Sequence, residues 1–253
     1  MTDPDISDIL GEWDYDPHMN ARIIAAADGC QKLQIRLRLG LIQMELDGRP
    51  DAQKPYGCES VLEYYRRQLD ERDAGEGFVI DHDAWEELSA EGILFYERYA
   101  VLFQLGDYER TACDTERNLA MFDLVQEYAE RPEDVAALEQ YRPYLIRMNR
   151  ASTAMSLLQQ ERLEEARATI EQALRELDEL DEVHTVIFEQ EMHRARSMLE
   201  GMLREIGERY EKPSRLDAVR QELERAVREE RYEDAARLRD HLRELGEGGE
   251  QPE

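Results

Sequence analysis

Residues 144–180 read YLIRMNRASTAMSLLQQERLEEARATIEQALRELDEL, and this stretch decides the fold. On both sides of the polar break at 159–162, apolar residues recur every three or four positions, which is the spacing of one face of an α-helix. Two amphipathic helices joined by so short a turn pack against each other as an antiparallel hairpin. The stretch therefore predicts a chain built from helical hairpins.

This hairpin resembles one tetratricopeptide repeat. Residues of the right size stand where that family places its packing residues, namely Ala154, Leu157, Leu163, Ala166, Ile170 and Ala173. An earlier stretch, 95–118, has the Gly-Asp-Tyr-Glu turn of such a repeat at 106–109, but carries Thr111, Thr115 and Asn118 in place of the small residues. The two turns lie farther apart than the roughly 34 residues of a tandem array. The resemblance therefore implies tetratricopeptide-like hairpins rather than a regular solenoid.

A β pattern is confined to about the first 51 residues. Apolar residues alternate with polar ones from Leu33 to Leu41, which predicts a strand with one buried face and one polar, solvent-facing side that includes Gln34, Arg36 and Arg38. Asp28-Gly29 before this strand signals a β-hairpin with Ala21–Ile24. A helix over 31–46 is the competing prediction, because Leu, Arg, Gln and Met all favour helix. Residues 47–51 predict a turn that closes the segment.

The remaining pattern is helical as far as residue 210. Asp83 with Glu86 reads as an N-cap with a capping box, and Gly106 separates two helices. We therefore expect a mainly α protein with four parts: a small α+β element at 1–80, a helical-hairpin body at 81–210, a terminal helical hairpin at 211–246 and a disordered tail at 247–253.

The terminal hairpin has a recognisable sequence. Ser214 is the predicted cap of its first helix, and its second helix carries Tyr-Glu-Asp-Ala-Ala-Arg-Leu-Arg-Asp at 232–240. With these residues, 214–246 resembles the UVR motif. That motif is the short helical hairpin of the UvrB and UvrC repair proteins, and it also occurs in regulators of Clp proteases and of a protein-arginine kinase.

The resemblance implies binding to another protein, often a second copy, through apolar residues left over after folding. Tyr232 is expected to pack at the turn, and Ala235 and Ala236 to let the helices approach closely. The predicted interaction residues are Leu216, Leu223, Tyr232, Ala235, Leu238, Arg239, Asp240 and Leu242. Because so small a hairpin buries too little surface to be stable alone, we expect it to dock on the rest of the chain, on a second copy or on a partner.

Charge and composition exclude several classes of protein. The chain has 32 Lys and Arg against 59 Asp and Glu, a net charge of −27, which argues against direct binding of nucleic acid or of anionic membranes. It lacks the roughly 20-residue apolar run of a membrane span, and its acidic start is unlike a signal peptide, so a cytoplasmic location is expected. Cys30, Cys58 and Cys113 form no CxxC pair, and there is no GxxxxGK[ST] loop of a UvrB-like ATPase.

Candidate sites for chemistry are few. Asp81-His82-Asp83 is the densest metal-like group, but adjacent side chains rarely meet at one ion. Cys58 stands before a predicted helix, where a thiol pKa falls, yet no histidine is near it in sequence. A possible ligand cluster comprises Asp47, Arg49, Asp51 and Tyr64. No cofactor or metal is expected.

These patterns favour a non-enzymatic adaptor that binds protein partners. Tyrosines such as Tyr96, Tyr99, Tyr141 and Tyr144 are core packing or the lining of a groove that grips a partner segment, and the acidic surplus favours a basic partner. The alternatives are a ligand-binding or enzymatic domain around residues 14–64, a self-associating structural protein, and a regulator of a DNA-repair or Clp/arginine-kinase system.

Overall fold

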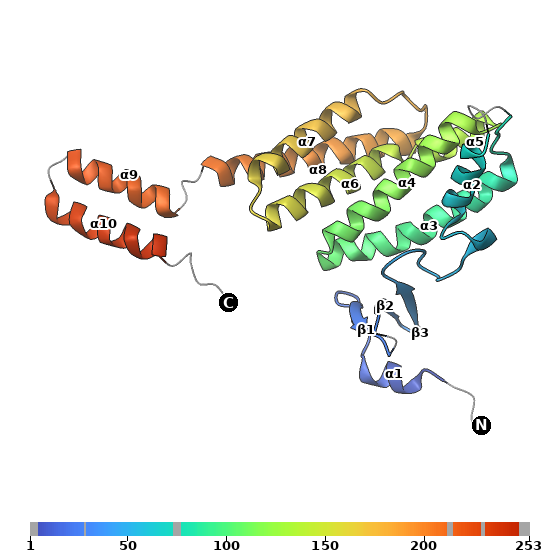
Figure 1. Cartoon of the computed structure of the whole chain (residues 1–253), viewed down its shortest axis with the longest axis horizontal. Helices are drawn as coiled ribbons and strands as arrows, with labels where there is room; N and C mark the ends of the chain where they lie inside the picture. Colours follow the sequence, from blue (N-terminus) through green and yellow to red (C-terminus); the bar gives the residue numbers. More distant parts are fainter. Residues whose placement is uncertain (1–4, 28, 73–76, 212–214, 229–230, 248–253) are drawn as a thin grey trace. The chain divides into compact units, whose positions relative to one another are not determined.

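The computed structural model (Figure 1) describes residues 5–27, 29–72, 77–211, 215–228 and 231–247. It divides into two compact units, Met1–Leu203 and Arg204–Glu253. The elements follow one another as α1 (Ser7–Glu12), β1 (Ala21–Ala25), β2 (Gln31–Leu37), β3 (Gly40–Glu45), the 3-10 helix η1 (Pro55–Gly57), α2 (Val61–Asp70), α3 (His82–Leu105), α4 (Tyr108–Tyr128), α5 (Pro132–Glu139), α6 (Arg142–Gln159), α7 (Leu163–Asp178), α8 (Val186–Glu211), α9 (Arg215–Arg228) and α10 (Tyr232–Glu247). The prediction of a mainly α chain with a small β element and a C-terminal helical hairpin is confirmed. The predicted tail lies, from residue 248 on, outside the described residues.

The N-terminal strands form an antiparallel sheet in the order β1-β2-β3. β2 pairs with both neighbours, and its register with β1 sets Ala21 opposite Ile35. The predicted β-hairpin is therefore present, and residues 31–46 do not form the competing helix. Asp28 of the predicted turn lies outside the described residues, but Gly29 beside it has a φ of 82°, a conformation that glycine adopts most easily.

Two details of the strand prediction are wrong. The single strand expected over 33–41 breaks into β2 and β3 at a turn that leaves Leu39 almost fully exposed. Gln34 and Arg36, expected to face solvent, are buried. The segment before β1 lies against this side of the sheet, where Arg36 Nε donates to the carbonyl oxygen of Trp13 at 2.9 Å.

The other face of the sheet packs on α3. Leu33 of β2 and Met44 of β3 are buried in one cluster with Leu102, near the end of α3. Arg98, one turn earlier, is also buried and donates to main-chain carbonyl groups at the end of β3 and in the turn that follows. The sheet is thus held to the helices by an apolar cluster and one arginine.

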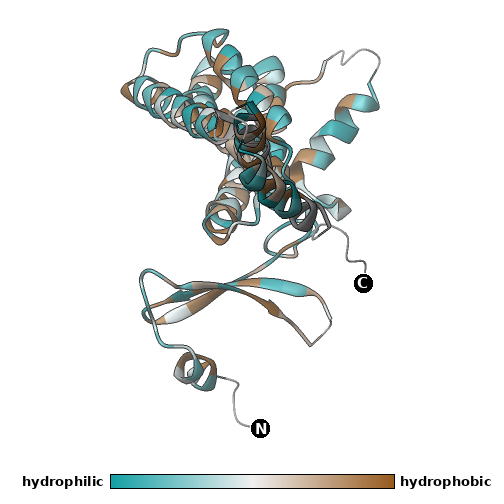
Figure 2. Ribbon diagram, turned by 90° about the vertical axis from the view of Figure 1, so that its left-hand side faces the viewer, coloured by the Kyte–Doolittle hydropathy of each residue, from teal (hydrophilic) through white to brown (hydrophobic). Residues whose placement is uncertain are grey.

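Two helical hairpins, α3 with α4 and α6 with α7, form the centre of the first unit, and α4 packs against α6 (Figure 1). Most helices carry both hydrophobic and hydrophilic residues (Figure 2), as amphipathic helices do. Ala154, Ala166, Ile170 and Ala173 are fully buried, so these predicted positions are packing positions. The likeness to tetratricopeptide repeats stays a prediction.

A polar side of α4 is buried between its neighbours. Thr111, Thr115 and Asn118, which replace the small residues of a tetratricopeptide repeat, are all buried. Thr115 Oγ1 donates to the carbonyl oxygen of Thr111 at 2.7 Å, and Asn118 Nδ2 donates to that of Gly92 in α3 at 3.0 Å. These hydrogen bonds offset the cost of burying the polar groups.

Asp81, rather than the predicted Asp83, caps α3. Its Oδ1 accepts from the main-chain N–H of Ala84 at 2.9 Å, while Asp83 lies in the first turn. We expect Asp81→Ala to lower the free energy of unfolding by about 1 kcal/mol, the usual cost of losing an N-cap. Asp83→Ala should cost less, because this carboxylate has no hydrogen-bond partner among the described residues and acts mainly on the helix dipole. Urea unfolding of both variants checks the order, and a larger loss for Asp83→Ala would contradict it.

Candidate functional site

The polar cluster predicted near the N-terminus does not meet at one point. Arg49 and Asp51 lie together, with Arg49 Nε donating to Asp51 Oδ1 at 2.8 Å. Asp47 is exposed and its Oδ1 lies 3.7 Å from Arg110 Nε of α4. Tyr64 stacks on a tyrosine of η1, with ring centroids 4.1 Å apart. Each part of the predicted cluster therefore has its own neighbours.

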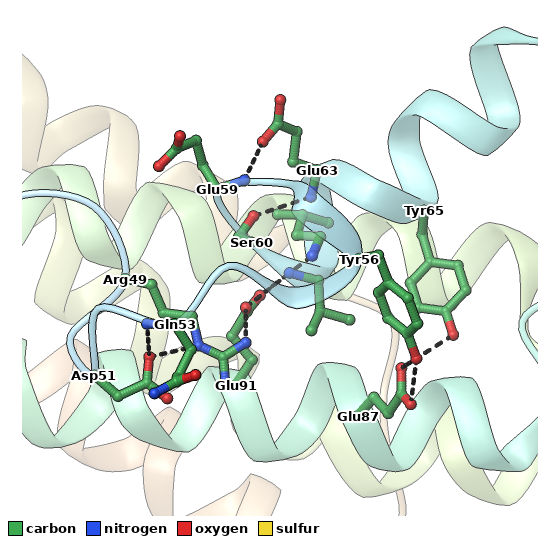
Figure 3. A network of polar contacts seen from close by, with 12 residues as sticks. Arg49, Asp51, Gln53, Tyr56, Glu59, Ser60, Glu63, Tyr65, Glu87 and Glu91 are labelled. Atoms are coloured by element: carbon green, nitrogen blue, oxygen red, sulfur yellow. Dashed lines mark hydrogen bonds and ion pairs between the residues drawn. The ribbon is translucent and has the colours of Figure 1, made fainter.

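Arg49 instead belongs to a buried network around Glu91 of α3 (Figure 3). Glu91 accepts from Arg49 Nη1 at 2.9 Å and from Arg117 Nη2 of α4. It also accepts from the main-chain N–H groups of Val61 and Leu62, at 2.8 and 3.2 Å. These N–H groups open α2 and have no acceptor within their own helix. Glu91 therefore fixes the start of α2 to α3, which is a structural role.

Figure 3 also shows two tyrosine hydroxyls that connect η1 and α2 to α3. Tyr56 of η1 donates to Glu87 Oε1 at 2.7 Å, and Tyr65 of α2 donates to Glu87 Oε2 at 3.4 Å. Burial and the nearby Glu87 carboxylate raise the pKa of Tyr65 above its ordinary value. Its hydroxyl thus stays protonated and serves as a donor.

The metal-like group, Asp81-His82-Asp83, and Cys58 were the other candidates for chemistry, and the structure gives His82 and Asp81 roles in holding the fold. Nδ1 of His82 lies 3.0 Å from both carboxylate oxygens of Asp134 in α5, and Asp81 caps α3. Cys58 is buried. Within the described ranges, no three His, Cys, Asp or Glu side chains are grouped so as to hold a metal ion.

A pocket of about 630 Å³ opens on the helical body. One side of α3 forms its longest wall, α4, α5 and α6 contribute the rest, and Glu191 of α8 also lines it. Aromatic rings dominate the lining: Trp85, Tyr96, Tyr99, Phe122, Tyr141 and Tyr144. Mostly apolar pockets of roughly 300–1,000 Å³ with a few polar groups are typical of binding sites.

Three polar atoms of residues that line this pocket are buried and have no hydrogen-bond partner among the described residues. They are Trp85 Nε1 and Ser89 Oγ on α3 and Glu191 Oε2 on α8. Glu191 also lies near two arginines, since its Oε2 is 3.4 Å from Arg147 Nη2 and its Oε1 accepts from Arg194. Buried polar atoms without a hydrogen-bond partner are rare in folded proteins.

Two tyrosines of the pocket, Tyr99 and Tyr144, have uncharged hydroxyls. The hydroxyls of Tyr99 and Tyr144 hydrogen-bond to each other. Burial raises the pKa of Tyr99, and burial also raises the pKa of Tyr144 to about 12. Both hydroxyls therefore keep their protons at physiological pH.

Sequence reasoning found part of this pocket. Tyr96, Tyr99, Tyr141 and Tyr144 were predicted as core packing or as the lining of a groove, and the structure brings all four to it. Trp85, Ser89 and Glu191 were missed. A usable signal was present in α3, because positions 85, 89, 93 and 96 follow the spacing of one helix face.

The second unit contains the predicted C-terminal hairpin, α9 and α10. Of its described side chains, Ala226 and Ala235 are buried, and the predicted leucines Leu223, Leu238 and Leu242 are half-buried. Nothing larger than an alanine is fully enclosed among these side chains. The described core of the hairpin is therefore thin.

Other predicted hairpin residues lie on its surface. Arg239 and Asp240 are exposed, as expected of residues that face away from the core. Tyr232 is exposed rather than packed at the turn, and Ala236 is exposed rather than placed between the helices, because Ala235 alone of the two alanines faces α9. The side chain of Leu216 lies outside the described part of the chain, as does Ser214.

No helix in the described ranges is both long and apolar enough to cross a bilayer.

The comparisons with known proteins concern the C-terminal hairpin. No curated protein and no solved structure matches the chain. The family model of the UvrB/uvrC motif matches residues 214–248, so the chain carries a UVR motif, a motif of protein or DNA interaction, as its C-terminal helical hairpin.

Proposed function

We propose that this protein is a non-enzymatic, cytoplasmic adaptor that binds protein partners through its UVR hairpin and its helical body. What carries the proposal is the thin core that the described side chains of the hairpin form. Val227 and Tyr232 are exposed large hydrophobic residues on it, and its described leucines keep part of their surface in solvent. A two-helix element with such residues exposed gains stability by burying them against another protein.

The charge of the chain supports a protein partner over a nucleic acid. At a net charge of −27, phosphate backbones are repelled, while a basic protein is attracted and its association is accelerated. The motif itself belongs to protein or DNA interaction, and this charge favours the first of the two. A second copy of the chain is another partner that the hairpin suits.

Substituting the exposed hairpin residues tests the proposal in the full chain. We expect Val227→Glu combined with Tyr232→Ala to abolish the copurification of specific partners from a native lysate, or dimer formation in light scattering. Val186→Glu on α8 is the matched control, since Val186 is 68% exposed and Val227 is 52% exposed. The control should bind like the wild type.

Two results would contradict the adaptor. One is an unchanged set of partners and an unchanged mass in the hairpin variant. The other is an enzymatic activity of the purified chain that survives the hairpin substitutions, which would favour the alternative of an enzyme.

A further inference from the structure

Arg36 of β2 is a buried cation without a carboxylate partner. It is 6% exposed and forms no ion pair with any described residue. Arg98, which is 2% exposed, is in contrast held by two hydrogen bonds to Asp114. Buried charges in folded proteins are normally paired with an opposite charge. The surroundings of Arg36 therefore indicate a place where an anionic group can bind.

The guanidinium group of Arg36 keeps one nitrogen for such a group. Its Nε donates to the carbonyl oxygen of Trp13 at 2.9 Å, and its Nη1 donates to the carbonyl oxygens of Leu37 and Gly40. Its Nη2 has no hydrogen-bond partner among the described residues, and it is not one of the atoms that the fold seals from solvent. Nη2 is therefore available to a carboxylate.

Two more arginines lie on this side of the sheet. The register of β1 with β2 places Arg22 diagonally across from Arg36, on the same side. Arg38 follows β2 and, like Arg22 and Arg36, contacts the segment before β1. Neither Arg22 nor Arg38 forms an ion pair with a described residue, whereas Lys32 nearby is paired with Glu45. We call Arg22, Arg36 and Arg38 the arginine face, a locally basic patch on a chain with a net charge of −27.

The N-terminal segment, residues 5–18, covers the arginine face. The guanidinium carbon of Arg22 lies 4.1 Å from the ring centroid of Trp13, and that of Arg38 lies 5.8 Å from the ring centroid of Tyr15. The carboxylates of the segment form no ion pair with these arginines; they belong to Asp5, Asp8, Glu12, Asp14 and Asp16. The cover thus uses aromatic rings and a carbonyl group, and it leaves the positive charges unpaired.

This cover is held weakly. α1, which forms part of the segment, has no buried residue, and Ile6 and Ile9 are 43% and 37% exposed. Among the described residues, the hydrogen bond from Arg36 to Trp13 is the one that joins the segment to the strands. Segments with few buried contacts open locally at a small cost in free energy. Residues 5–18 can therefore leave the arginine face while the rest of the sheet stays folded.

We propose that the arginine face binds an acidic segment of a partner protein that carries an aromatic residue, and that residues 5–18 occupy the face until this segment displaces them. The aromatic residue takes the place of Trp13 on Arg22, since guanidinium groups stack on aromatic rings. A carboxylate of the partner pairs with Arg36, which the chain's own segment does not do. The inference goes beyond the proposed function, because it uses neither the UVR hairpin nor the helical body. An acidic group is favoured here by the local charge, although the rest of the surface favours basic partners.

A labelled synthetic peptide of residues 5–18 tests the proposal in the full chain, with binding followed by fluorescence anisotropy. The wild type is expected to bind the peptide weakly, because its own segment occupies the face. Full-length Trp13→Ala holds its own segment less firmly and should bind the peptide roughly tenfold more tightly, since the apparent affinity falls with the fraction of chains whose face is covered. The same peptide with Asn and Gln in place of its acidic residues should bind more weakly and with less dependence on salt.

Arginine variants connect the binding to the face. In the Trp13→Ala chain, Arg38→Gln is expected to weaken peptide binding severalfold. Arg131→Gln, just before α5, is the matched control, since Arg131 is also exposed and forms no ion pair with a described residue. Hydrogen exchange of the wild type needs no substitution: the amides of α1 should exchange far faster than those of β2.

Equal binding by the wild type and Trp13→Ala, full binding by Arg38→Gln, or protection of α1 as strong as that of β2 would overturn the proposal. Tighter binding of a single-stranded oligonucleotide than of the peptide would overturn it as well, because the face would then select phosphate groups. The partner test with Val227→Glu and Tyr232→Ala leaves the sheet unchanged. A negative peptide result beside a hairpin-dependent partner would therefore overturn this inference and leave the proposed function standing.

Discussion

Glu91→Ala is expected to lower the free energy of unfolding by about 3–5 kcal/mol, the usual cost of removing one partner of a buried ion pair. Arg49 and Arg117 lose the carboxylate between them. The N–H groups of Val61 and Leu62 lose their acceptor at the start of α2. Urea unfolding followed by circular dichroism measures the loss, and hydrogen exchange should show that the amides of α2 are the most affected.

Two further variants help to interpret the stability loss measured for Glu91→Ala. Glu97→Ala removes an exposed glutamate from the same helix and should cost no more than about 0.5 kcal/mol, as most surface substitutions do. Glu91→Gln keeps an acceptor oxygen but removes the charge, so an intermediate loss is expected. If Glu91→Ala costs no more than Glu97→Ala, the network does not stabilise the fold.

Arg98→Met is the second substitution with a large expected effect, again about 3–5 kcal/mol. Arg98 donates through Nε and Nη2 to Asp114 of α4, at 2.8 and 2.6 Å. Through Nη1 it donates to the carbonyl oxygens of Glu45 and Gly48, each at 2.8 Å. Methionine fills part of the space but satisfies none of these groups. We therefore expect the sheet to detach more easily from α3 and the whole fold to become less stable.

The loss in Arg98→Met should grow with pH. Burial raises the pKa of Asp114 above its ordinary value, and Arg98 opposes that rise. Without Arg98 the pKa of this carboxyl in the folded state rises further. A group whose pKa is raised by folding contributes stability below its unfolded pKa, and this contribution is lost as the pH rises through the folded pKa. The free energy of unfolding of Arg98→Met is therefore expected to fall less far below that of the wild type at about pH 5 than at about pH 8.

Urea unfolding at both pH values measures this trend, with Arg150→Met as the control. Arg150 pairs with Glu176 at a partly exposed site, so its loss should stay under about 1 kcal/mol at either pH. A double variant, Arg98→Met with Asp114→Leu, should recover part of the stability, because no buried charge is left alone. Equal losses for Arg98→Met at the two pH values would contradict the assignment to Asp114.

The helical hairpins could be predicted because their information is local. The apolar spacing in 144–180 gives α6 and α7, and Gly106 marks the end of α3 with a φ of 78°. The sheet was predicted less well. The segment around Trp13 that contacts Arg36 is not revealed by any pattern inside the strands, and Gln34 is hydrogen-bonded to Arg22 and Gln43 on the neighbouring strands. Periodicity gives the two sides of an element but not what packs on each.

The candidate sites show the same limit. Arg49 was predicted as a ligand residue, yet its partner Glu91 is 42 residues away along the chain. The pocket combines α3, α4, α5, α6 and one residue of α8, so Glu191 and Ser89 gained significance only from the fold. The UVR motif, in contrast, is a continuous stretch, and its sequence sufficed to identify it.

The way in which Arg98 holds the sheet also sets an order of folding. Its hydrogen bonds to Glu45 and Gly48 close loops of 53 and 50 residues, whereas each helical hairpin closes over a short turn. Contacts between distant residues form more slowly than local ones, because the chain must first be brought together. During synthesis the strands emerge before α3 exists, so the apolar face of the sheet stays uncovered until the helix that packs on it has been made. The part of the first unit that is made first is the part that becomes stable last.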